Sequence, residues 1–424
     1  MREHLRDTFW FTPTVGLVAA GLLAFGVLEL DRLLIEALQE EQDYDTVESL
    51  IGIADDTKTI VTTVGSAMLT FIGVVFSISL VALQMASGQF SPRVVRLYVR
   101  SRITKSTFAV FLATFLFALL VQTSYEGETD PRAVQTVPIV SSLACVCMVL
   151  VSLGLFIAYV NSTLRLMQVS HVVDRITRES FRVLARLEAV DTAADGKGAL
   201  PTATAEIAYL GRAGVLRDVN IARLVRVARR HGVVLRLIPR IGDFVVPGTP
   251  LLAVHGGTGA PPQRLLRYSV SVGVERTFHQ DPAFGLRQLS DIALRALSPA
   301  VNDPTTAVQC LDRITQFLAA LAGRPLGVLH HGDGKGVVRL VQELPGWTGL
   351  VDLGFTEIRG CAIGSPQVTR RLTAALDDLW GLAPEDRRPP LERHRALLAQ
   401  SVERTVPEAA DREFSLLPDR QGIG

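Results

Sequence analysis

The sequence predicts a membrane protein with a four-helix transmembrane domain followed by a mixed α/β cytoplasmic domain. Three observations predict this class. Apolar residues make up 48% of the 424 residues, and the mean hydropathy of +0.30 is high for a soluble chain. Four apolar segments near the N-terminus approach the length that crosses a hydrocarbon core of about 30 Å. Beyond them, the pattern changes to short strands and amphipathic helices.

The four apolar segments are predicted to be membrane-spanning helices, because irregular backbone cannot face lipid. They cover residues 9–28, 59–85, 108–123 and 137–160 of a transmembrane domain at 1–162. A cleaved signal peptide is the alternative for the first segment, since it also follows basic residues. Its apolar run is long for a signal peptide and no A-x-A site follows it, so we expect a retained span.

The connections between the four segments alternate in charge. Basic residues dominate the N-terminus, the second connection and the segment after the fourth span, whereas acidic residues dominate the first and third connections. Basic residues accumulate on the cytoplasmic side of membrane proteins. The sequence therefore predicts a multipass protein in contact with lipid, with both termini in the cytoplasm.

The cytoplasmic part is predicted to contain four segments. They are an amphipathic linker helix at 163–190, a β-rich subdomain at 205–275, a helical and mixed subdomain at 276–408, and a flexible tail at 409–424. Two helices are expected to begin at the Asp-Pro pairs 281–282 and 303–304. An aspartate caps a helix N-terminus and proline fits its first position.

The segment from Gly242 to Val254 resembles the G-D-x-V-x-x-G-x-P-L hairpin of barrel-sandwich hybrid domains, the fold of lipoyl and biotinyl carriers. Two short strands are expected about its Pro247-Gly248 turn. No lysine lies between positions 197 and 335, so the modifiable lysine of those carriers is absent. We therefore expect a β part like a barrel-sandwich hybrid, without a carrier role and without a cofactor.

Three stretches of the chain resemble a bacterial family of predicted membrane proteins, domain of unknown function 2254. They are QFSPR at 89–93, DPAFGLRQL at 281–289 and ALRALSPAVNDPTTA at 293–307. The resemblance covers nearly the whole chain. It implies a four-span protein of the bacterial inner (plasma) membrane with a cytoplasmic domain, and it implies no particular activity.

The second span carries a stripe of small and polar residues along one side. At 100° per residue, Val64, Phe71 and Ile78 fall on the opposite side. The polar stripe consists of Thr59, Thr62, Ser66, Thr70, Gly73, Ser77 and Gln84. A helix surrounded by lipid has no need of hydroxyl groups, so the polar stripe is expected to face protein or water.

Two interpretations of the polar stripe stay open. Ser66 and Thr70 are four residues apart, as are Gly73 and Ser77, and this spacing lets two helices pack closely. In the other interpretation, copies of this helix line a pore in a homo-oligomer. The stripe runs the full depth of the membrane, which favours the pore. We therefore predict a channel for small inorganic ions, assembled or gated by the cytoplasmic domain. The alternative is a membrane-anchored regulatory or scaffolding protein without transport activity.

Charged residues are predicted at both mouths of such a pore. The acidic residues of the outer mouth are Asp55, Asp56, Glu126 and Glu128. They would attract cations, although outer loops carry few basic residues in any case. The basic residues of the inner mouth are Arg93, Arg96 and Arg100. In the cytoplasmic domain, Asn302 and Asp303 are candidate ligand contacts, and helix capping explains them equally.

Motifs of catalysis are missing from the sequence, which has no Walker loop, G-x-S-x-G elbow or H-E-x-x-H helix. His279 near Asp281 is interpreted as an exposed histidine beside a helix cap. His330, His331 and Asp333 are interpreted as part of a glycine-rich turn rather than a metal site. We therefore expect a protein that is not an enzyme, holds no metal and binds no nucleic acid.

Overall fold

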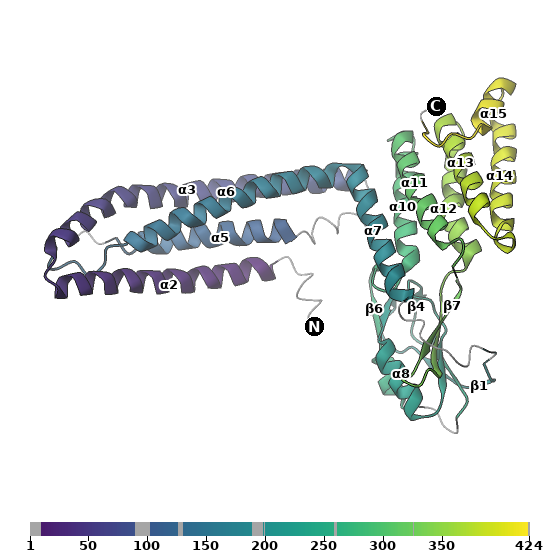
Figure 1. Ribbon diagram of the computed structural model, residues 1–424, viewed down its shortest axis with the longest axis horizontal. Coiled ribbons are helices and arrows are strands. Elements are labelled where there is room, and N and C mark those ends of the chain that lie inside the picture. Colours follow the sequence, from purple (N-terminus) through teal and green to yellow (C-terminus); the bar gives the residue numbers. More distant parts are fainter. Residues whose placement is uncertain are drawn as a thin grey trace. The chain divides into compact units, whose positions relative to one another are not determined.

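The computed structural model describes residues 10–89, 102–125, 130–188, 198, 200–257, 261–324 and 326–422. The chain divides into two compact units, Met1–Gln168 and Val169–Gly424. Figure 1 traces both of them along the sequence.

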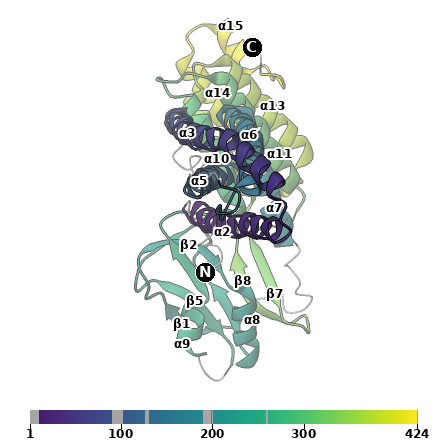
Figure 2. The same ribbon diagram turned by 90° about the vertical axis from the view of Figure 1, so that its left-hand side faces the viewer.

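Four long apolar helices form the first unit. They are α2 (Phe11–Glu40), α3 (Tyr44–Gln89), α5 (Arg102–Gln122) and α6 (Ile139–Met167). Each has the length and composition to cross a membrane. The helices run alongside one another, and the end-on view in Figure 2 places α5 among the other three. In the most apolar 18-residue stretch of α5, 56% is buried, against 17% in the corresponding stretch of each other helix. The other three helices therefore pack around α5.

The acidic connection between the first two predicted spans, residues 29–58, is mostly helical. Both helices extend beyond the predicted spans, and residues 41–43 join them. Gln42 adopts a left-handed conformation with φ of 59°. Asp43 accepts hydrogen bonds from the backbone N and the Oγ of Thr46, at 3.2 and 2.6 Å. A tight helix hairpin with its own cap therefore forms this connection.

Two β-sheets form one part of the second unit. The five-stranded sheet has the order β1 (Ala203–Ala208), β5 (Pro250–His255), β3 (Val234–Leu237), β8 (Val338–Glu343), β7 (Val328–Gly332). The three-stranded sheet has the order β4 (Phe244–Val245), β2 (Gly214–Val219), β6 (Val270–Gly273). Strands β3 and β8 pair in parallel, and the other pairs are antiparallel. Since β8 pairs with β3, the predicted subdomains 205–275 and 276–408 share one sheet.

The hairpin expected about the Pro247-Gly248 turn does not form. Strands β4 and β5 flank this turn as predicted, but β4 pairs with β2, whereas β5 pairs with β1 and β3. The local sequence pattern correctly predicted the positions of the two strands. It did not predict their pairing partners, because these are set by contacts between residues distant in sequence. The class of four apolar helices followed by a mixed α/β part is confirmed, and the barrel-sandwich-hybrid arrangement is not.

Helices form the rest of the second unit. They are α7 (Val169–Glu188), α8 (Ile221–Arg230), α9 (Gln263–Arg267), α10 (Pro282–Ala296), α11 (Pro304–Leu321), α12 (Trp347–Ala362), α13 (Pro366–Leu382), η1 (Glu385–Arg387), α14 (Pro389–Thr405) and α15 (Ala409–Leu416). The predicted caps of α10 and α11 are confirmed. Asp281 accepts a hydrogen bond from the backbone N of Phe284 at 3.1 Å, and Asp303 accepts one from that of Thr306 at 3.0 Å.

Two segments of the helical part make contacts that the sequence did not indicate. Helix α7, within the predicted amphipathic linker helix 163–190, packs on α10 and α11, with the rings of Phe181 and Phe317 edge to face at 5.6 Å. The second segment is 409–424, which was expected to be a flexible tail. It contains α15, and the Arg370 guanidinium lies over the ring of Phe414 at 4.3 Å. The Arg420 guanidinium hydrogen-bonds to Asp378 at 2.8 and 3.0 Å. Contacts with α13 therefore hold the C-terminal segment.

Candidate functional site: the polar stripe of helix α3

The polar stripe lies on the outer surface of α3, away from the three other helices of its unit. Its seven residues are all exposed in the single chain: Thr59, Thr62, Ser66, Thr70, Gly73, Ser77 and Gln84. The opposite side is buried at Val61, Met68, Val75 and Ala82. These four recur at intervals of seven residues, which keeps one face of a long helix against its neighbours. The polar stripe is therefore not the surface that packs within the subunit.

Three hydroxyls of the polar stripe bond to the backbone of their own helix. Thr62, Ser66 and Thr70 donate to the carbonyl oxygens of Lys58, Thr62 and Ser66, at 2.8, 3.1 and 3.3 Å. Each hydroxyl oxygen keeps acceptor capacity on its outward side. Such bonds also reduce the cost of exposing a hydroxyl to lipid. They are compatible with water, a second helix or lipid on that side.

Gly73 has no packing reason to be glycine among the described residues of the chain. A Cβ atom at this position would meet no other atom within 4 Å, whereas a Cβ at Gly65 would lie 3.9 Å from the Cβ of Ala118. Glycine in a membrane helix lets another backbone approach closely. Position 73 therefore faces open space, and packing within the described chain does not require glycine there.

Polar groups that face the interior of the bundle pair with each other. The Tyr159 side chain is fully buried. Its hydroxyl lies 2.6 Å from the Oγ of Ser79 and donates to the carbonyl oxygen of Val75 at 3.1 Å. The hydroxyls of Thr114 and Ser152 lie 3.1 Å apart. In the described part of the bundle, the polar contacts between helices therefore use residues other than those of the polar stripe.

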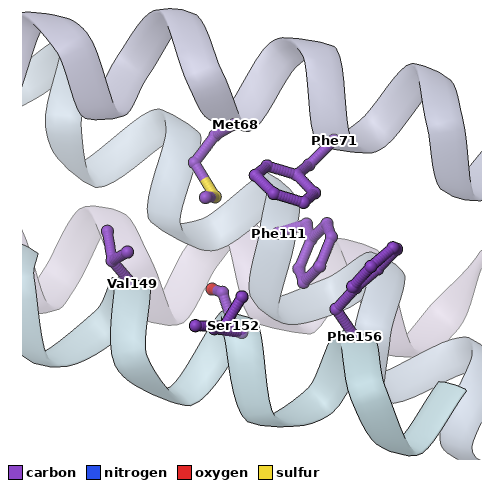
Figure 3. A pocket seen from close by; sticks show the side chains of 7 residues that line it. Met68, Phe71, Phe111, Val149, Ser152 and Phe156 are labelled. Atoms are coloured by element: carbon purple, nitrogen blue, oxygen red, sulfur yellow. The ribbon is translucent and has the colours of Figure 1, made fainter.

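A small cavity lies between α3, α5 and α6 (Figure 3). Its volume is about 30 Å³, and its lining consists of Met68, Phe71, Phe111, Val149, Ser152, Leu153 and Phe156. The rings of Phe71, Phe111 and Phe156 gather at one end of it. A space of this size takes about one water molecule, so it is no route for ions through the subunit.

The predicted mouth residues are only partly covered by the structure. Asp55 and Asp56 lie within α3, one turn before Thr59, and Asp56 is exposed. The remaining mouth residues lie outside the described part of the chain: Glu126, Glu128, Arg93, Arg96 and Arg100.

Asp31 is a structurally important acidic residue that lies between the first two predicted spans. It is fully buried on α2. Its carboxylate accepts hydrogen bonds from the backbone N of Val140 at 2.7 Å, and from the N and Oγ of Ser141 at 3.0 and 2.5 Å. The side chain of Pro138 makes no capping bond at the start of α6. Asp31 on α2 instead accepts hydrogen bonds from the backbone N–H groups at this helix end. The sequence feature that could have indicated this role is the position of Asp31 directly after the first apolar segment.

The candidate residues of the second unit have structural roles. Asp303 also accepts a hydrogen bond from the Oγ of Thr306 at 2.6 Å. Asn302 has φ of 48°, a conformation that asparagine tolerates better than most residues. Helix ends therefore account for both residues, and ligand binding by them stays a prediction.

The histidines considered from the sequence lie in the second unit, and His330 and His331 belong to strand β7 rather than to the expected turn. His279 Nδ1 is 3.6 Å from an oxygen of Asp218, whereas Asp281 pairs with Arg276 at 2.7 Å. His331 is buried, with Nε2 3.2 Å from Oε1 of Gln342. Within the described ranges, no three His, Cys, Asp or Glu residues are placed to hold a metal ion.

A sequence model of the protein family described as "Predicted membrane protein (DUF2254)" matches residues 6–378. The chain belongs to this family. Uncharacterized proteins of Mycobacterium bovis and Mycobacterium tuberculosis are each 30% identical to it over 429 residues, covering 98% of this chain and 80% of the relative. No solved structure matches the chain. The DUF2254 match ends in α13, so α14 and α15 lie beyond it.

Proposed function

We propose that this protein forms a homo-oligomeric channel for small ions, in which α3 of each subunit lines the pathway and the second unit assembles or gates it. The outward position of the polar stripe carries the proposal. Small and polar residues occupy one exposed face of α3, while its other face packs into the bundle. A symmetric ring of subunits can bring such faces together around an axis.

The length of the polar stripe favours a pathway over a simple helix contact. At 1.5 Å per residue, the distance from Thr59 to Gln84 is about 38 Å, which exceeds the hydrocarbon core of about 30 Å. Two crossing helices need small residues only near their crossing point. A water-filled path needs polar groups through the whole core.

The packed interior of a single chain supports a pathway formed between several chains. In the described part of the bundle, the buried hydroxyls of Ser79 and Tyr159 bond to each other, and the cavity beside Ser152 has a volume of about 30 Å³. Ions would therefore have to pass along the outer surface of α3. Such a path excludes lipid only when neighbouring subunits enclose it.

The charge near one end of α3 favours cations. With both termini in the cytoplasm, as the positive-inside rule predicts, Asp56 would lie at the outer end of the pathway. It is exposed one turn before Thr59. A carboxylate at a narrow mouth raises the local concentration of cations.

Ion flux through liposomes that contain the full-length protein tests the proposal. We expect flux from the unaltered protein, and a strong reduction in Ser77→Trp and Gln84→Trp, because an indole would obstruct the path. Val74→Trp and Phe76→Trp are the matched controls, since these side chains are exposed on the flanks of the polar stripe. They should leave the flux unchanged.

Absence of flux from a folded oligomer, under gradients of several ions, would contradict the channel. That outcome would favour a membrane-anchored regulatory or scaffolding protein, whose four helices serve as a mount. Equal loss of flux in the polar-stripe and flank variants would place the pathway elsewhere.

A further inference from the structure

Helix α8 presents a face of exposed arginines on the second unit. Leu224, Val227 and Ala228 are buried in the core between this helix and the sheets. At 100° per residue, its four arginines lie within an arc of about 120°. We name them the α8 arginine face: Arg223, Arg226, Arg229 and Arg230, all exposed.

Among the described residues, the α8 arginine face lacks the acidic partners that several other arginines of the second unit have. Elsewhere, ion pairs join Arg178 to Asp174, Arg287 to Asp291, Arg339 to Asp333, Arg393 to Asp352 and Arg420 to Asp378. Helix α8 contains no acidic residue. Among the described residues, Arg223 donates to the carbonyl oxygen of Tyr268 at 3.4 Å, and no arginine of this face forms an ion pair.

The helix dipole does not explain the α8 arginine face as a whole. Arg229 and Arg230 stand in the last turn of α8, where the dipole favours cations. Arg223 stands in the first turn, where the dipole disfavours them. Four exposed arginines without a described ion pair therefore stand together on one face of α8, which concentrates positive charge there.

Exposed apolar and aromatic side chains adjoin the α8 arginine face. Tyr268 follows α9 directly, beside Arg223, and its side chain is 76% exposed. On α9, Leu265 is 41% exposed and Arg264 is exposed. Arginines with an adjacent tyrosine and leucine are typical of surfaces that lie at the level of lipid headgroups.

We infer that the α8 arginine face docks on the anionic headgroups of the membrane that holds the chain's own four helices. Its positive charge complements anionic phospholipid. The second unit begins at Val169, and α6 ends at Met167, so the chain tethers this unit directly at the membrane. Docking is therefore intramolecular and needs no free partner, which raises the effective concentration of the lipid surface. A nucleic acid lacks that advantage.

A fluorescent probe on the α8 arginine face tests the inference in the full-length protein. The exposed cysteines Cys147 and Cys361 are replaced by serine, and Ala222→Cys, exposed on the same face, carries the probe. The protein is reconstituted into vesicles containing a nitroxide-labelled lipid that quenches fluorescence. We expect stronger quenching with phosphatidylglycerol than with phosphatidylcholine alone. High salt should remove the difference, because it shortens the Debye length.

Matched variants distinguish binding of anionic headgroups by the arginines from simple proximity of the second unit to the membrane. Combined Arg226→Gln, Arg229→Gln and Arg230→Gln should lower the docking equilibrium constant about five-fold per arginine. Combined Arg393→Gln, Arg395→Gln and Arg420→Gln changes the net charge equally at paired positions and should leave quenching unchanged. A second probe at Ala399→Cys, exposed on α14, should show no dependence on anionic lipid.

Equal quenching in neutral and anionic vesicles would overturn the inference, as would quenching that survives the three substitutions on α8. Tight binding of an added oligonucleotide, without quenching by lipid, would overturn it in favour of a nucleic-acid surface. Both readouts are independent of ion flux, so they stand apart from the channel proposal.

Discussion

The carboxylate of Asp31 on α2 caps helix α6 at Ser141, 110 residues further along the chain. It accepts three hydrogen bonds there, two of them from backbone N–H groups that would otherwise lie unpaired at a helix start. A helix N-terminus also attracts negative charge through its dipole. Asp31 therefore fixes α6 against α2 within the four-helix bundle.

Asp31→Ala is expected to destabilise the bundle by at least about 2 kcal/mol, because it leaves buried donors without an acceptor. Unfolding of the full-length protein in mixed detergent measures the loss. Asp43→Ala is the control, since Asp43 caps α3 at an exposed hairpin, where loss of a cap costs about 1 kcal/mol. Equal losses in the two variants would contradict the role of Asp31.

The Ser79–Tyr159 contact is expected to contribute modestly to the packing of α3 on α6. Tyr159→Phe removes the 2.6 Å hydroxyl pair and the bond to the carbonyl of Val75. Hydrogen bonds between membrane helices contribute about 0.6 kcal/mol on average. A double-mutant cycle with Ser79→Ala should give a coupling of that order. Additive effects of the two substitutions would show that the pair is energetically silent.

Two glycines of the membrane unit are expected to respond oppositely to substitution. A Cβ at Gly16 would lie 3.0 Å from the carbonyl oxygen of Ala109, whereas a Cβ at Gly73 would meet open space. Gly16→Val should therefore destabilise the subunit by about 1–3 kcal/mol through overpacking. Gly73→Val should leave the stability of the bundle unchanged and reduce ion flux in liposomes, because its side chain would narrow the proposed pathway. Loss of stability in Gly73→Val would contradict an outward position of Gly73.

The stability of the second unit is expected to fall with acidification through His394. Burial lowers the pKa of this side chain below 6.5, and the hydrogen bond from Nε2 to Asp352 at 2.9 Å opposes the shift only in part. The unfolded chain therefore takes up the proton first, so this contribution is complete above about pH 6.5 and is lost below it.

Thermal unfolding of the full-length protein between neutral pH and about pH 5 measures the His394 effect. His394→Gln cannot take up a proton, and its melting temperature should fall less steeply with acidification than that of the unaltered protein. Identical slopes for the two proteins would show that other groups control the response.

Local rules predicted the features that depend on neighbouring residues. The Asp-Pro pairs at 281–282 and 303–304 begin α10 and α11, because a cap and a first-turn proline act within four residues. The apolar side of α3, including Val75, is the buried side, because the helical period fixes which residues share a face.

Features that depend on contacts between distant residues could not be predicted from local sequence patterns. Asp31 was one acidic residue among several, and only its contact with Ser141 distinguishes it. Strand β8 pairs with β3 across about a hundred residues, which no local pattern specifies. The C-terminal segment was expected to be flexible because it is a chain terminus, whereas Arg370 and Asp378 of α13 contact it.

The most direct test of the channel is the reactivity of single cysteines along α3 towards a membrane-impermeant, water-soluble thiol reagent. Cysteines are introduced at Ser66, Thr70, Gly73 and Ser77, with Val74 and Phe76 on the flanks as controls, in a background without Cys147 and Cys361. A water-filled pathway predicts rapid labelling at the four polar-stripe positions and slow labelling at the two flank positions. Protection of all four polar-stripe positions in the assembled protein would contradict the channel.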